Sequence, residues 1–168
     1  MAAAENVGIR RALIAIAVLS LGLWFVEIDT AFGLPAHPLF LHVPVVFVPI
    51  LTLAALALAA GKLDDHRIPL AAFSVLTLIA VFLTAGAGEA LRAEREAEIQ
   101  DKATLASHAD SGDALRYAMV LLTAALLASL FTKRTHVVLR IVIALLAIHA
   151  LFWVIRTGHL GSELVWNT

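Results

Sequence analysis

The sequence predicts an all-α, polytopic membrane protein with five transmembrane helices. Hydrophobic residues make up 61% of the 168-residue chain, and only 15% of its residues are charged. Its mean hydropathy is +0.93, whereas a soluble domain is usually about half apolar. The charged residues lie in short groups between long apolar runs. We therefore expect a single transmembrane helical-bundle domain that covers residues 1–168.

Five apolar runs are each long enough to cross the hydrocarbon core, which takes roughly 20 helical residues. The expected spans are residues 11–32, 38–60, 68–90, 112–132 and 136–157. The second span follows Pro35 and ends at Gly61, as is typical of a helix start and a helix end. The residues from Asp110 to Asp113 are typical of an N-cap and place the start of the fourth span there.

The flanking charges predict that the N-terminus lies in the cytoplasm and the C-terminus outside. Basic residues in the two inner loops include Lys62, Arg67, Lys133 and Arg134. The first outer loop, residues 27–37, contains no lysine or arginine, as the positive-inside rule requires. The first apolar run is longer than that of a signal peptide, so we expect it to be retained as a helix.

The longest connection, at about residues 89–110, carries charges of alternating sign. Arg92 and Glu96 stand four residues apart, as do Glu98 and Lys102, a spacing that supports a solvated helix. We expect a short amphipathic segment on the outer face, or a charged cover that holds the third and fourth spans apart.

Composition also excludes several classes of partner and site. The net charge is −1 and no basic stripe is present, so nucleic acid is not expected as a partner. The chain has no cysteine, which excludes disulfides, iron–sulfur clusters and covalently attached haem. No nucleophile elbow surrounds its serines, so a hydrolase is not expected.

Histidines on one side of the membrane are the main indication of function. The five expected outer histidines are His37, His42, His108, His149 and His159, whereas His66 and His136 lie inside. Neutral imidazole is a ligand of haem iron and of other transition metals. An ionisable residue inside a span is a functional candidate by default.

Each of these histidines also has a structural explanation. His42, about one turn inside its span, could be satisfied by a backbone carbonyl, and His37 is expected at the surface. His149 shares a helix face with Trp153 and Arg156, which could be a plain interfacial belt. His108 and His159 could be exposed loop histidines, and the glycines around His159 allow a tight turn that could fold the tail back over the outer mouth.

A stripe of small residues marks the third span. Ala80, Thr84 and Gly88 recur at four-residue intervals. Such a stripe allows a neighbouring helix to approach closely, or it could form a flat slot for a planar cofactor.

Three motifs stand in a characteristic order along the chain. They are His37-Pro38 with His42 and Pro44, His108-Ala109 with Gly112, and Gly158-His159-Leu160-Gly161 with Glu163-Leu164-Val165. Together they resemble a family of small bacterial integral-membrane proteins, number 2231 among the domains of unknown function. The resemblance covers about residues 35–168, with the first span an addition to a four-helix core. Family members occur beside or fused to cytochrome-like electron carriers, which implies a redox setting for His42, His108 and His159.

These observations favour a b-type haem protein in which two histidines bind one iron near the periplasmic side. The preferred axial ligands are His42 with either His108 or His149, and His37 is a further candidate. Arg156 or His159 would hold the haem propionates. The chain would pass electrons from quinol to a periplasmic carrier or partner subunit, as an oxidoreductase or as a subunit of one.

Two other hypotheses remain open. The chain could bind Cu or Zn through His42, His108 and His149, or it could be a cofactor-free accessory subunit of a larger membrane complex. In each case we expect a multi-pass protein of the bacterial inner membrane that contacts lipid and forms a homo- or hetero-oligomer.

Overall fold

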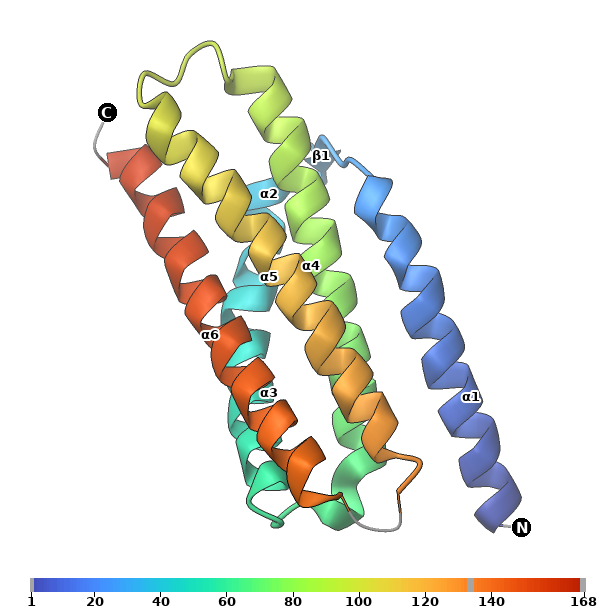
Figure 1. Ribbon diagram of the computed structural model, residues 1–168. Coiled ribbons are helices and arrows are strands. Elements are labelled where there is room, and N and C mark those ends of the chain that lie inside the picture. The colour runs from blue at the N-terminus through green and yellow to red at the C-terminus, as the bar shows by residue number, and fades with distance from the viewer. Residues whose placement is uncertain (1, 133–134, 167–168) are drawn as a thin grey trace.

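The computed structural model describes residues 2–132 and 135–166, which form a helical bundle (Figure 1). Its elements are α1 (Ala2–Ser20), η1 (Leu21–Phe25), β1 (Thr30–Ala31), β2 (Leu34–Pro35), α2 (Ala36–Phe40), α3 (His42–Ala59), η2 (Asp64–His66), α4 (Arg67–Arg95), α5 (Lys102–Ser129) and α6 (Val137–Trp166). Within the described residues, five helical segments are long and apolar enough to cross a membrane. The predicted fold class is confirmed, and the chain is a multi-pass membrane protein. Lys133 and Arg134, which the sequence places on the inner side, lie outside the described residues.

The two ends of the bundle carry different elements (Figure 1). The amino-terminal end holds the start of α1, the connection from α3 to α4 and the connection from α5 to α6. The carboxy-terminal end holds α2, the connection from α4 to α5, and the end of α6. Because no membrane is present, the N-in orientation stays a prediction.

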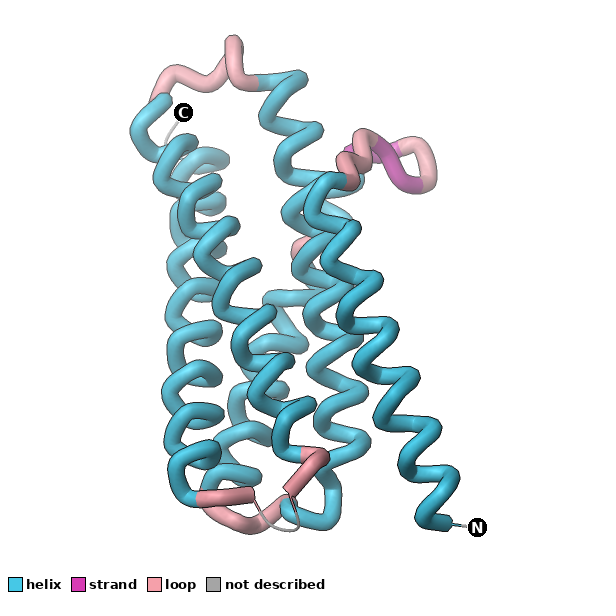
Figure 2. Tube along the Cα trace, turned by 45° about the vertical axis from the view of Figure 1, so that its right-hand side comes forward, coloured by secondary structure: helices cyan, strands magenta, loops and turns pink. Residues whose placement is uncertain are grey.

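The first span is shifted relative to its predicted range. It covers Asn6–Phe25, and the following residues form a small hairpin in which β1 pairs antiparallel with β2. The hairpin projects from the carboxy-terminal end (Figure 2). Its turn residues Phe32 and Gly33 have φ values of 55° and 77°, as a two-residue hairpin turn requires. Residues 26–32, which the sequence assigns to the first span, are therefore not part of the helix.

The start of α5 corrects the predicted N-cap. The cap is Asp101, whose carboxylate accepts hydrogen bonds from the Thr104 amide at 2.9 Å and from the Thr104 hydroxyl at 2.6 Å. Both bonds lower the pKa of Asp101, and the bond from the hydroxyl has the larger effect. Residues 110–113 lie inside the helix, and Leu105 is already buried, so burial extends the helix beyond the predicted start.

The charged segment at 89–110 is divided between two long helices. α4 continues to Arg95, and residues 96–101 connect it to α5. Arg92 and Glu96 lie 3.9 Å apart, as their spacing predicts. Lys102 instead donates to the backbone carbonyl of Glu96. The segment is thus a charged cap on two helix ends rather than a separate helix.

α6 extends beyond the predicted end of the fifth span at residue 157. The helix continues through the glycines at 158 and 161 to Trp166, so the predicted tight turn is absent there. A helix satisfies its own backbone hydrogen bonds, which is favourable near or within the hydrocarbon region. Both glycines consequently present their backbone on a helix face.

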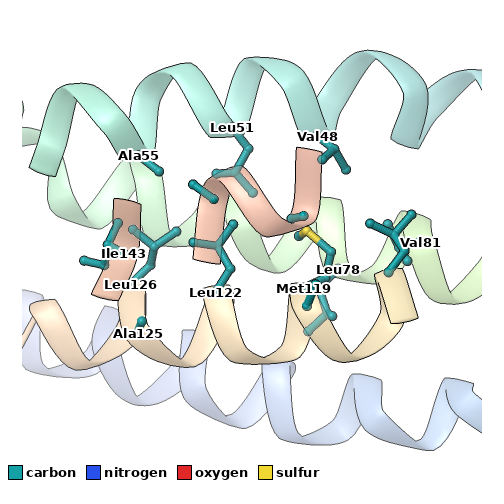
Figure 3. Packing of buried hydrophobic residues seen from close by; sticks show 14 of the residues in the cluster. Val48, Leu51, Ala55, Leu78, Val81, Met119, Leu122, Ala125, Leu126 and Ile143 are labelled. Carbon is teal, nitrogen blue, oxygen red and sulfur yellow. The ribbon is translucent and has the colours of Figure 1, made fainter. Parts of the chain in front are cut away.

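Four helices, α3 to α6, enclose the main hydrophobic core (Figure 3). Leu51 of α3, Leu78 of α4, Leu122 of α5 and Ile143 of α6 are almost completely buried there. Thr52 donates across the core to the Ala147 carbonyl at 3.1 Å. α1 packs on the outside of this bundle, mainly against α4.

Polar contacts hold the amino-terminal end together. The Asp64 carboxylate accepts hydrogen bonds from Arg140 and Thr135. Arg67 donates to the backbone carbonyls of Asp64, Ser129 and Thr132. Carbonyls at the end of a helix have no intrahelical partner, so Arg67 supplies donors that the end of α5 would otherwise lack.

Candidate histidine site

His37 is held against α4 by two contacts. It lies in the short helix α2, and its Nδ1 is 2.9 Å from the backbone carbonyl of Thr84. Its ring rests on Gly88, where an added Cβ would be 3.0 Å from Nδ1 and 3.1 Å from Cε1. A side chain at position 88 would therefore displace the imidazole. The stripe of small residues on α4 thus serves to seat a histidine.

His108 is held against α6 in the same way. Its Nδ1 is 3.0 Å from the backbone carbonyl of Thr157. Its ring rests on Gly161, where an added Cβ would be 3.0 Å from Cε1. Each histidine therefore bonds a threonine carbonyl and covers the glycine four residues later. We call Thr84 with Gly88, and Thr157 with Gly161, the two Thr–Gly seats.

The two seated imidazoles lie close together in a perpendicular, edge-type contact. Their ring centroids are 6.2 Å apart, and their planes are perpendicular. One ring is supplied by α2 on α4, the other by α5 on α6. Both rings are partly buried. The structure thus brings two histidines from separate elements within reach of one small central atom.

The hydrogen bonds fix the tautomer of both rings. A carbonyl oxygen can only accept, so Nδ1 must carry the proton in each case. In the neutral ring, Nε2 then keeps its lone pair. Within the part of the chain that the structure describes, neither Nε2 has a hydrogen-bond partner. Two imidazoles are therefore prepared as ligands through the same atom.

A model of one protein family matches the chain over residues 33–168, and its description is Predicted membrane protein (DUF2231). The chain belongs to the DUF2231 family. The match contains His37, His108 and both Thr–Gly seats, and it leaves out α1. It confirms the resemblance inferred from the motifs. The chain matches no curated protein and no solved structure.

Among the described residues, no ring contact joins the other candidate histidines of this DUF2231 chain to the pair. His42 is the first residue of α3, and its side chain is exposed. His149 is also exposed, and its Nε2 accepts a hydrogen bond from Trp153 at 3.0 Å. His159 is exposed and lies 3.4 Å from Glu163, while Arg156 is exposed. We therefore take His37, rather than His42 or His149, as the partner of His108.

The pair provides two candidate ligand atoms, one from each histidine. Across residues 2–132 and 135–166, no group of three or more His, Asp and Glu side chains is placed to hold a metal ion. Protein-only sites for zinc use three or four protein ligands. An iron whose other ligands come from a cofactor needs only two protein ligands.

A buried arginine lies further along α5. Arg116 is 4% exposed and contacts Asp113 at 3.0 Å and Glu89 at 3.7 Å. Its guanidinium also lies over the Trp24 ring at 5.2 Å. The contacts show that it joins α4, α5 and η1, about 12 Å along the helix from His108.

Sequence reasoning missed the two Thr–Gly seats as a pair. The signal was present, because Thr-x-x-x-Gly occurs at 84–88 and again at 157–161. The first was recognised only as a stripe of small residues, and the second was interpreted as a turn. Recognising the repeat requires knowing that both stretches are helical and that each faces a histidine.

Proposed function

We propose that this membrane protein binds one b-type haem between His37 and His108 and transfers electrons near the carboxy-terminal end of the bundle. The separation of the two rings is the observation that carries the proposal. Two imidazoles that ligate one ion through nitrogens at about 2 Å have ring centres roughly 6 Å apart. The measured value is 6.2 Å.

The donor set fits this cofactor. Two neutral histidines are a known axial pair for haem, and non-covalent attachment needs no cysteine. The chain has none. When bound, haem supplies a reversible one-electron iron couple. A zinc site would need further protein ligands near the pair.

The chain's own residues would orient the ligands. A ligating histidine usually donates its other N–H to a carbonyl, which fixes the ring orientation and makes the ligand more basic. The Thr84 and Thr157 carbonyls accept these bonds here. The glycines at 88 and 161 let an edge of each ring approach the helix backbone closely. Ligand orientation is therefore set before any cofactor arrives.

One further polar atom supports a polar ligand at this place. The hydroxyl of Thr157 is buried, and no described residue gives it a hydrogen-bond partner. The hydroxyl of Thr84, in the matching seat, donates to the Ala80 carbonyl at 2.8 Å. A buried unpaired hydroxyl is uncommon. Thr157 would supply a donor to an oxygen of the bound group.

Two axial histidines favour electron transfer over oxygen activation, because they leave no open position on the iron. The redox setting that the resemblance implies agrees with this role. We extend the proposal to quinol as electron donor and to a periplasmic carrier or partner subunit as acceptor. In the predicted orientation the site lies on the outer side of the bacterial inner membrane, and a homo- or hetero-oligomer would bring the acceptor close.

The visible spectrum of the full-length protein, purified in detergent after haem-replete expression, tests the proposal. We expect a Soret band and, after reduction, sharp α and β bands typical of bis-histidine ligation. A colourless preparation that contains stoichiometric copper or zinc would support the metal-site hypothesis instead. A preparation without haem and without metal would leave the accessory-subunit hypothesis.

The glycine seats provide a second test. Replacing Gly161 by valine places side-chain atoms where the His108 ring lies, so we expect haem affinity to fall by about 10- to 100-fold, as when other groups that orient a ligand are changed. The matched control is Gly158→Val on the same helix, since no atom lies within 4 Å of a Cβ at position 158. Haem titration of the two apoproteins measures the difference. Equal affinities would contradict the seat.

A further inference from the structure

A pocket opens at the opposite end of the molecule from the histidine pair. It has a volume of about 200 Å³, and its lining residues are Arg10, Asp64, Asp65, Arg67, Ile68 and Leu130. It lies between α1 and the elements η2, α4 and the end of α5. In both views α1 leans away from the bundle toward the N-terminus (Figures 1 and 2). The pocket is therefore at the amino-terminal end of the bundle, beside a helix that packs on the outside of the four-helix core.

Two of the four charged residues in the pocket are used by the fold. Asp64 is paired with Arg140, and Arg67 donates to three backbone carbonyls. The other two, Arg10 and Asp65, have no ion pair within residues 2–132 and 135–166. The Nε of Arg10 is buried and has no hydrogen-bond partner among the described residues. One cationic and one anionic group thus remain for a ligand.

Arg10 and Asp65 together fit a ligand that carries a negative and a positive charge close together. A guanidinium binds a phosphate through directed, charge-assisted hydrogen bonds. A carboxylate beside it accepts hydrogen bonds from a primary ammonium. Ile68 and Leu130 add apolar surface to the same pocket. The pocket is lined by two arginines and two aspartates, so its charge is balanced and a zwitterionic lipid headgroup fits it.

We infer that this pocket binds the phosphoethanolamine headgroup of a phospholipid, with its phosphate on Arg10 and its ammonium on Asp65. Asp65 would distinguish the primary ammonium from a trimethylated one, which has no N–H to donate. The site would fix α1 to the four-helix core through lipid. This inference is independent of haem binding, because it involves other residues at the other end of the molecule.

Native mass spectrometry of the delipidated full-length protein tests the inference. The probe is an equal mixture of phosphatidylethanolamine, phosphatidylglycerol and phosphatidylcholine with the same acyl chains. We expect about tenfold higher retention of phosphatidylethanolamine than of phosphatidylcholine. Arg10→Gln should remove retention of all three. Asp65→Asn should remove only the preference for ethanolamine.

Arg11→Gln is the matched control, because Arg11 is the exposed neighbour of Arg10 and does not line the pocket. Equal loss in Arg10→Gln and Arg11→Gln would overturn the inference, as would equal retention of ethanolamine and choline lipids by the unchanged protein. Free phosphoethanolamine is added as a competitor. Displacement of the lipid at equal concentration would show a soluble phosphate ligand and overturn the lipid assignment.

Discussion

Replacing His108 by alanine is expected to abolish the haem spectrum of the purified protein. The imidazole of His108 is one of two that lie in ring contact in the described structure, so its loss would leave the proposed haem site with a single histidine. We expect the Soret absorbance per protein to fall about tenfold or more. His37→Ala should have the same effect, since the two rings are seated equivalently. Absorbance spectra of the variants, expressed with excess haem, measure this.

His42→Ala and His149→Ala are the controls for this experiment. Both side chains are exposed, and both variants should keep the spectrum of the unchanged protein. The sequence by itself predicts the opposite for His42, so the experiment separates the two interpretations. A spectrum that is lost in His42→Ala and kept in His37→Ala would contradict the site proposed here.

Replacing Gly86 by alanine is expected to destabilise the whole bundle. A Cβ at position 86 would lie 1.9 Å from the backbone oxygen of Val26 and 3.1 Å from its carbonyl carbon. The obstacle is backbone, so no rotamer change can relieve it, and α4 must move away from the segment after η1. Overpacking of this kind costs about 1–3 kcal/mol. We expect the Tm in detergent to fall by roughly 5 °C.

Gly112→Ala is the matched control for Gly86→Ala. Gly112 is also inside a long helix, but no atom lies within 4 Å of its added Cβ. Alanine has the higher helix propensity, so the Tm of this variant should stay the same or rise slightly. Gly86 lies between Thr84 and Gly88, so its replacement should also weaken haem binding. Equal melting temperatures for the two variants would show that α4 tolerates the shift.

Sequence patterns alone are sufficient to predict the architecture of this protein. Uninterrupted apolar runs and their flanking charges predict five spans, because each helix must satisfy its own backbone in lipid. The spacing of the outer histidines also predicts that several lie toward the same end. The predicted positions of the helix ends are less accurate, because capping groups such as Asp101 compete with other polar residues nearby.

Which histidines meet depends on the packing of the helices. In a soluble helix the apolar stripe marks the packed face, but a membrane helix is apolar on the lipid side as well. The sequence therefore does not show which side of α3 or α6 faces its neighbours. His42 and His149 lie on exposed sides, whereas the short helix α2 turns His37 toward His108. That pairing depends on how α4 and α6 present their Thr–Gly seats, which is a property of packing.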